Sequence, residues 1–397
     1  MSLGKYFGPS TLVAAAFIGP GTLTVCTLAG VETGYELLWV LAFSIVCTII
    51  LQEMSARLGL ATQRGLGEAI RKEFPGGPSR WLVFFLVIGA ILVGNAAYEA
   101  GNISGGNLGL ELLVGEAGAY PWLIGVPCAL LLFLGGYRWV ERLLIGLVVL
   151  MSACFLLTTV LVQPDFGAIL AGFVPSFPSG DRLLLLMAVV GTTVVPYNLF
   201  LHASTVSKKH GPEASLRDLR IENAVAVTLG GLISVLIVIT AAASSAEVGS
   251  VKNAADLAVQ LEPAFGSSAR VLMGVGLLAA GLSSALTAPL AAAYAARGLF
   301  GWPADDRDPR FRAVWAVILL IGIGVATSGL RPLAIIRFAQ VTNALLLPAI
   351  AVYLLYLANS RSVMGRHVNS RLANILGGLV ILVTLGLAAR TFVLLLN

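Results

Sequence analysis

Two short stretches interrupt otherwise apolar segments: Gly19-Pro-Gly-Thr22 near the start of the chain, and Gly191-Thr-Thr-Val-Val-Pro-Tyr-Asn198 near its middle. Proline lacks the N–H that a helix interior needs, and glycine lowers helix stability, so each segment is predicted to be a helix broken near its centre. The role of the two breaks depends on whether the helices lie in water or in a membrane, and the composition indicates which.

The composition is that of a membrane protein. Of the 397 residues, 58% are hydrophobic and 11% are charged, against roughly 45–50% and 25% in a soluble domain. Apolar runs of about 20 residues, each long enough to cross ~30 Å of hydrocarbon, recur from end to end. The connections carry no catalytic or nucleotide-binding motif, so neither an enzyme nor a cofactor is predicted. The chain is expected to be an all-α polytopic membrane protein in contact with the lipid bilayer.

A hydropathy window of about 19 residues predicts eleven spans. They cover residues 9–30, 36–58, 81–107, 121–135, 143–162, 183–208, 222–246, 267–298, 311–328, 332–358 and 372–395. An odd number places the termini on opposite sides of the membrane. Most of the 25 Lys and Arg residues fall in connections on the side of the N-terminus. The N-terminus is therefore predicted to be cytoplasmic and the C-terminus outside, in the cell (inner) membrane, and the net charge of +5 does not predict nucleic-acid binding.

The spans divide into two sets of five, and each set begins with a broken helix. Residues 1–397 are expected to form one transmembrane domain, with repeat one at about 9–162, repeat two at about 183–358 and an extra helix at about 372–395. Interrupted helices at matching places in two halves indicate an inverted-repeat transporter with its site at the breaks. We therefore expect a secondary active transporter that works by alternating access.

Four segments carry a family resemblance. Residues 191–204 resemble the sixth helix of the Nramp (natural resistance-associated macrophage protein) family, whose usual pattern there is Met-Pro-His-Asn followed by a His-Ser pair. Residues 51–59, 276–287 and 340–348 are similar to the family's second, eighth and tenth helices. The chain is identified as a divergent, bacterial-type member. The resemblance implies a LeuT-type fold and proton-coupled symport of divalent metal cations such as manganese and iron.

The residues that the family uses to hold the metal are replaced in this sequence. Gly19 and Thr22 stand where the family's first break has aspartate and asparagine. Val195 stands in place of the methionine, and Tyr197 in place of a histidine. Selection of a transition metal normally uses sulfur or imidazole together with carboxylate. No metal-ligand set is therefore predicted, and transport of manganese or iron is not expected.

The candidate substrate-binding residues lie at the two breaks and on the tenth helix. They are Gly19, Gly21, Thr22, Thr192, Val195, Tyr197, Asn198 and Gln340. In the first span, the backbone N–H groups at the start of the half-helix that follows the break can bind an anion, as in other broken-helix transporters. Two cargoes therefore stay open: a divalent cation held by a reduced, partly hydrated site, and a small anion or zwitterion carried with an ion. Ser283, Ser284 and Thr287 of the eighth helix either face this site or pack between helices.

Two ionisable residues are candidates for coupling to protons. Glu99 is far from either end of its span, where a charge costs ~2.5–3.5 kcal/mol, and it shares a helix face with Asn95 and Asn102. We hypothesise that Glu99 takes up and releases the coupling proton; the alternative is a structural carboxylate bonded to a neighbouring helix. His202 matches the family's second histidine and either relays a proton or serves in packing. The sequence does not indicate an oligomeric state.

Overall fold

The computed structural model describes residues 18–115, 120–135, 138–177, 180–211, 213–245 and 249–396, and within these ranges all regular structure is helical. The long helices are α2 (Pro20–Thr33), α3 (Leu38–Thr62), α5 (Gly77–Val114), α6 (Tyr120–Leu134), α7 (Arg138–Leu161), α9 (Asp181–Thr193), α10 (Pro196–Lys209), α11 (Leu216–Ala243), α15 (Ala269–Phe300), α16 (Pro309–Ala326), α17 (Pro332–Asn359) and α19 (Arg371–Leu396). The short helices are α4 (Leu66–Glu73), α8 (Phe166–Ala171), α13 (Ala254–Val259), α14 (Glu262–Phe265) and α18 (Arg361–Met364).

The predicted spans agree with these helices. In the described ranges nine helical segments are long and apolar enough to cross a membrane, and a shorter apolar helix covers Pro121–Leu134. These ten segments correspond to the second to eleventh predicted spans. Of the first span, α2 is the described part, while residues 9–17 lie outside the described residues. The total of eleven spans therefore stays a prediction.

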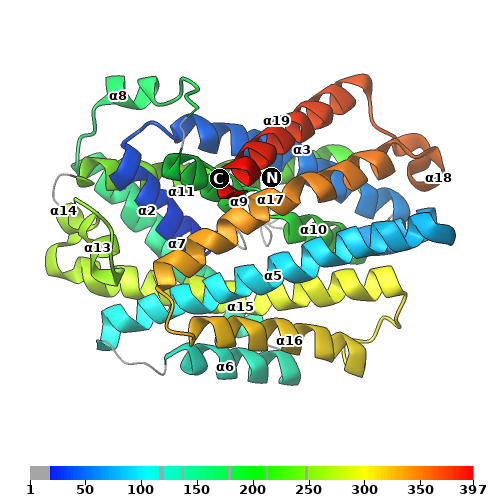
Figure 1. Ribbon diagram of the computed structural model, residues 1–397, viewed down its shortest axis with the longest axis horizontal. Helices are drawn as coiled ribbons and strands as arrows, with labels where there is room; N and C mark the ends of the chain where they lie inside the picture. Colours follow the sequence, from blue (N-terminus) through cyan, green and yellow to red (C-terminus); the bar gives the residue numbers. More distant parts are fainter. Residues whose placement is uncertain are drawn as a thin grey trace.

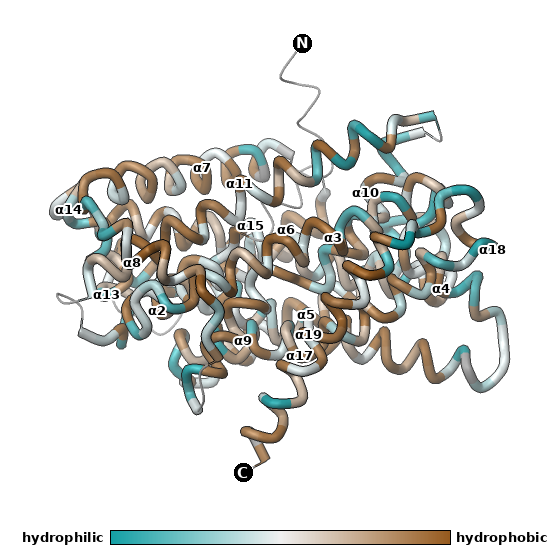
Figure 2. Tube along the Cα trace, turned by 90° about the horizontal axis from the view of Figure 1, so that it is seen from above, coloured by the Kyte–Doolittle hydropathy of each residue, from teal (hydrophilic) through white to brown (hydrophobic). Residues whose placement is uncertain are grey.

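Helices α5, α15, α16 and α17 run along the long axis of the molecule (Figure 1). The short helices gather at two opposite ends: α8, α13 and α14 lie at one end, and α4 and α18 at the other (Figure 2). Helices α8, α13 and α14 follow the fifth and seventh predicted spans, whereas α4 and α18 follow the second and tenth. The predicted topology places these two groups of connections on opposite sides of the membrane, which agrees with their positions. Between the two ends, many large apolar side chains are exposed, as expected where helices face lipid. Which end faces the cytoplasm stays a prediction.

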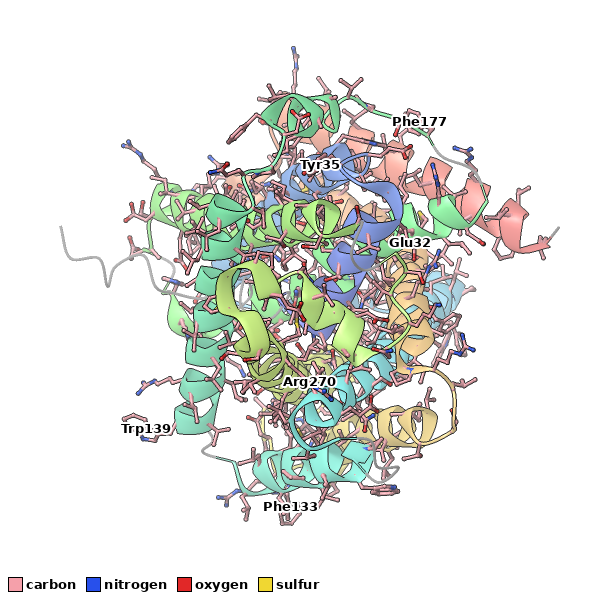
Figure 3. The ribbon with its side chains drawn as sticks, turned by 90° about the vertical axis from the view of Figure 1, so that its left-hand side faces the viewer. Glu32, Tyr35, Phe133, Trp139, Phe177 and Arg270 are labelled. Carbon is pink, nitrogen blue, oxygen red and sulfur yellow. The ribbon has the colours of Figure 1, made fainter. Side chains whose placement is uncertain are left out.

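The connection that contains α8 packs on the turn between α2 and α3, where Figure 3 labels Tyr35. Tyr35 lies in the turn after α2, and the backbone N–H of Trp39 donates to the carbonyl of Gly172, just after α8, at 3.0 Å. The rings of Trp39 and Phe177 pack edge to face with centroids 5.3 Å apart. The α8 connection therefore covers the end of α2 that lies away from the break.

The predicted break in the sixth span is confirmed. Helix α9 ends at Thr193 and α10 begins at Pro196, with Val194 and Val195 in non-helical conformations between them. Pro196 occupies the first position of α10, where a missing N–H costs nothing. Helix α2 likewise begins at Pro20, after an extended Gly19, although the segment before residue 18 lies outside the described residues.

The two half-helices that follow the breaks pack in equivalent ways. Helix α2 packs on α11, and α10 packs on α3. A Cβ on Gly30 of α2 would lie 2.5 Å from the carbonyl oxygen of Val238, and one on Gly59 of α3 would lie 2.4 Å from that of Ala203. Glycines at such crossings let helix backbones approach closely. The first span thus packs on the seventh, and the sixth packs on the second. In a five-plus-five repeat the first and second spans correspond to the sixth and seventh, so these two contacts are equivalent.

A pair of glycine substitutions on α5 tests this packing at the first break. A Cβ on Gly105 would lie 2.1 Å from Cβ of Pro20, whereas one on Gly89 would meet nothing within 4 Å. We expect Gly105→Ala to destabilise the protein by about 1–3 kcal/mol through overpacking. Gly89→Ala should instead stabilise it by up to about 1 kcal/mol, because alanine is the better helix former. Thermal unfolding of both variants in detergent measures this, and equal midpoints would contradict the contact with Pro20.

Candidate functional site

The two breaks meet through a pair of hydroxyl groups. Oγ1 of Thr22, in the first turn of α2, lies 3.0 Å from Oγ1 of Thr192, in the last turn of α9, and the two hydroxyls form a hydrogen bond. Both side chains are buried. The structure therefore brings together the two predicted breaks, although the two threonines are far apart in the sequence.

Helix α17 packs on both breaks through Gln340. A Cβ on Gly21 would lie 2.2 Å from Nε2 of Gln340, and one on Gly191 would lie 1.8 Å from the carbonyl oxygen of Gln340. Only glycine fits at either position without displacing α17 or its side chain. Gln340 itself is buried, and its Oε1 has no hydrogen-bond partner within the described part of the chain. The structure thus places the predicted residues Gly21, Thr22, Thr192 and Gln340 around one point.

The start of α10 supplies Tyr197 and Asn198. Both are buried, and the Tyr197 ring packs edge to face on Tyr98 of α5, with centroids 5.2 Å apart. Neither the nitrogen nor the oxygen of the Asn198 side chain has a hydrogen-bond partner among the described residues. Val195, immediately before α10, is also buried. These three predicted residues therefore lie at the second break, and Asn198 retains unused hydrogen-bonding capacity.

Two residues outside the predicted set complete the wall beside Gly19. A Cβ on Gly19 would lie 2.9 Å from Oγ of Ser284 on α15 and 3.5 Å from the hydroxyl of Tyr98. Of the three polar residues considered on the eighth helix, the structure thus assigns Ser284 to the first break. Tyr98 was missed. It is spaced one helical turn from Asn95 and Asn102, and this spacing was the available signal.

The electrostatics at the breaks come from helix ends and neutral side chains. The first N–H groups of α2 and α10 and the last carbonyls of α9 lie there, so partial positive and negative charges are both present. One of these carbonyls, that of Thr193, accepts a hydrogen bond from Oγ1 of Thr48 at 3.2 Å. Within the described ranges no group of three or more His, Cys, Asp or Glu residues could hold a metal ion. Cys26, the thiol nearest in sequence to the first break, lies in the main apolar core.

Glu99 is fully buried on α5. Its Oε2 accepts a hydrogen bond from Nδ2 of Asn102 at 3.1 Å, which confirms that the two residues share a face. The other carboxyl oxygen has no hydrogen-bond partner among the described residues. A Cβ on Gly322 of α16 would lie 2.6 Å from Cγ of Glu99, so the carboxyl stands where α16 crosses α5. Its role in coupling stays a prediction.

His202 is buried on α10, one turn beyond Asn198. The same helix lines a cavity of about 160 Å³. Its wall includes Phe200, Ser204 and Lys208 of α10 and Arg297 of α15. This cavity opens at the end of the molecule that holds α4. The region between the break and that end is therefore partly hollow.

Comparison with known proteins gives consistent results. The family described as natural resistance-associated macrophage protein-like matches residues 10–394. The divalent metal cation transporter MntH of Yersinia pestis (strain Pestoides F) is 30% identical over 98% of this chain and 95% of its own. The structure of a manganese transporter from Eremococcus coleocola, in complex with an aromatic bis-isothiourea substituted compound, covers 96% of this chain and 85% of its own, with 25% identity and a TM-score of 0.76. A nucleobase-cation-symport-1 family transporter shares the fold, with a TM-score of 0.59, 16% identity and coverage of 98% and 92%.

Proposed function

Because this chain belongs to the natural resistance-associated macrophage protein-like (Nramp) family, we propose that it is a secondary active transporter that works by alternating access. Its substrate binds between the start of α2 and the break that separates α9 from α10. The proposed location is the inner membrane, with the N-terminus in the cytoplasm. The coupling ion is a proton, carried by Glu99, with His202 as the second candidate.

The observation that carries this proposal is the hydrogen bond between Thr22 and Thr192. It joins the start of α2 to the end of α9, at the break between α9 and α10. In transporters built from inverted repeats, a central site between broken helices is alternately exposed as one bundle rocks against the other. Gln340 lies against Gly21 beside this contact, and Asn198 lies at the start of α10; both have polar atoms without a hydrogen-bond partner in the described structure, which supports a binding role for this region.

The chemistry of the site favours a small anionic or zwitterionic solute. A carboxylate can accept from the backbone N–H of Gly21 at the start of α2. This requires the side chain of Gln340, which fills the space beside Gly21, to move aside when the solute binds. The carbonyls at the end of α9 and the side-chain oxygens of Asn198 and Gln340 can accept from an ammonium group. Such a solute needs no carboxylate from the protein.

A partly hydrated divalent cation is the second candidate. The relatives named above as transporters of divalent metal cations favour it, and so do the two unpartnered side-chain oxygens, Oδ1 of Asn198 and Oε1 of Gln340. Magnesium keeps several waters and needs few protein ligands, although it usually takes at least one carboxylate. The sulfur and imidazole ligands that select manganese or iron are missing from both breaks.

A binding screen of the purified protein separates the two cargoes. Thermal unfolding is measured with Mn²⁺, with Mg²⁺ and with a panel of amino and carboxylic acids; a ligand at 100 times its Kd stabilises the protein by about 2.7 kcal/mol. The stabilisation should disappear in Gln340→Ala and persist in Thr342→Ala, which lies on a more exposed face of α17. Stabilisation by micromolar Mn²⁺ would reject the first candidate, and stabilisation by none of the ligands would reject the site.

A further inference from the structure

A second, larger cavity lies at the end of the molecule where α4 and α15 meet. Its volume is about 410 Å³, and five of its lining residues are basic while one is acidic. The basic residues are Arg64, Arg71, Lys72, Arg80 and Arg297, and the acidic residue is Glu68. The sequence pattern had assigned these basic residues to membrane topology alone, but the fold brings them to one cavity.

Four of these five cations have no ion-pair partner within the described part of the chain. Arg297 is the exception, since its Nη1 lies 2.7 Å from Oδ1 of Asp306. Arg80 donates to the carbonyl of Pro75 at 3.0 Å and lies over the ring of Phe84, so it is held in place without losing its charge to a carboxylate. The cavity therefore has a clear excess of positive charge, which favours an anion.

The cavity is at the level where α5 enters the apolar part of the molecule. Arg80 is the first residue of the apolar span Arg80–Val114. The next turn of α5 exposes Trp81 (59%) and Phe85 (75%). On the other side, the ring of Phe300 stacks on that of Trp302, a residue of the cavity wall, with centroids 5.2 Å apart. Tryptophans in this position are typical of a membrane interface.

We propose that this cavity binds the phosphate group of an anionic phospholipid from the adjacent leaflet. Guanidinium groups match phosphate oxygens with paired N–H donors, and basic pockets between membrane helices on the cytoplasmic side are suited to anionic head groups. With the phosphate among Arg64, Arg71 and Lys72, the acyl chains lie against the exposed apolar face of Trp81 and Phe85. A free phosphate ion would satisfy the same charges but would leave that face unused.

Lipid in this cavity is also placed to influence transport. Glu68 and Arg297 line this cavity and also the smaller one that reaches α10. Helix α10 is the half-helix after the second break, and it moves if the chain works by the alternating access proposed above. An occupied head-group site therefore holds α4 and α15 together beside the moving half-helix, so we expect lipid to change the rate of transport as well as the stability of the protein.

The test compares lipids and variants on the purified full-length chain. Thermal unfolding in detergent is measured with added phosphatidylglycerol, with phosphatidylcholine and with millimolar inorganic phosphate. The test variant is Arg64→Gln with Lys72→Gln; both side chains are exposed and neither pairs with a carboxylate in the described structure. The matched control is Arg361→Gln with Arg366→Gln, two exposed arginines of α18 and the turn after it that do not line the cavity.

We expect phosphatidylglycerol to raise the unfolding midpoint of the native protein and of the control, and the test variant to need at least tenfold more lipid for the same shift. Equal stabilisation by phosphatidylcholine, or an unchanged response of the test variant, would overturn the proposal. Full reproduction of the shift by inorganic phosphate would identify a free-ion site and would also overturn it. If the double variant does not fold, Lys72→Gln alone is compared with Arg366→Gln, and the same outcomes apply.

Discussion

Replacing Gly19 with aspartate, Val195 with methionine and Ser284 with alanine is expected to create a Mn²⁺ site that the native chain lacks. The first two substitutions restore a carboxylate at the first break and a thioether at the second, the two kinds of ligand that the site is missing. A soft sulfur ligand together with a hard carboxylate suits a first-row divalent metal, and oxygens of Asn198 and Gln340 are available to complete the site.

The third substitution follows from the geometry beside Gly19. A Cβ there would lie 2.9 Å from Oγ of Ser284, closer than side chains approach without a shift. Removing that hydroxyl leaves room for the new carboxylate, while the hydroxyl of Tyr98, 3.5 Å from the same Cβ, remains as a neighbour. Without Ser284→Ala, the double substitution combines new ligands with overpacking, and a failure to bind metal would be ambiguous.

Calorimetry with Mn²⁺ and Mg²⁺ measures the expected gain. The triple variant should bind Mn²⁺ at least about 100-fold more tightly than the native protein, a difference of about 2.7 kcal/mol. A control with Gly19→Asn, Val195→Leu and Ser284→Ala has nearly the same volume but neither the charge nor the sulfur, and should bind no better than the native chain. Equal Mn²⁺ affinity in the native protein and the triple variant would show that the replaced residues do not explain the cargo.

The position of the break in the sixth span could be predicted from the sequence, because proline and glycine act locally. Pro196 begins α10 as expected, and the hydroxyls of Thr22 and Thr192 meet as two corresponding breaks should. Helix lengths were less predictable. The predicted span 81–107 is contained within α5 (Gly77–Val114), which continues through Gly105, Gly106 and Gly109. Glycines there suggest a helix end, but in the structure they allow close packing, since a Cβ on Gly109 would lie 2.5 Å from the backbone nitrogen of Leu278.

Contacts between distant segments could not be predicted in the same way. The close approach of Gly191 to the backbone of Gln340 and of Gly105 to Pro20 depends on how whole helices cross. Tyr98 belongs to the site because the rotation of α5 about its axis turns this side chain toward Tyr197. The spacing of residues along the sequence does not determine that rotation. The basic cavity was likewise hidden, since Arg64, Arg80 and Arg297 come from separate segments.

Substituting Glu99→Gln is expected to abolish the effect of pH on transport while leaving the fold intact. The carboxyl is fully buried, and one of its oxygens has no hydrogen-bond partner among the described residues. A charge in such a place is costly, so gain and loss of a proton there can be tied to a change in the exposure of the site. The amide of glutamine can still accept the hydrogen bond from Asn102, but it cannot release a proton.

Reconstituted liposomes with an imposed pH gradient measure this effect, with the cargo that the binding screen identifies. If one proton moves with each solute and no membrane potential is present, a gradient of one pH unit supports about tenfold accumulation, or about 1.4 kcal/mol. Glu99→Gln should reduce accumulation to the level without a gradient, yet exchange of internal for external solute should continue, because exchange needs no net proton movement.

The matched control is Glu111→Gln, the same chemical change further along α5, where the side chain bonds to Asn107 rather than standing beside Gly322. It should keep the tenfold response. His202→Gln distinguishes the second candidate, because a loss of the pH response there but not in Glu99→Gln would transfer the coupling role to α10. Accumulation by Glu99→Gln that still follows the pH gradient would leave Glu99 as a structural carboxyl between α5 and α16. Loss of both accumulation and exchange would mean that Glu99 is needed for the conformational change itself, since proton release alone does not limit exchange.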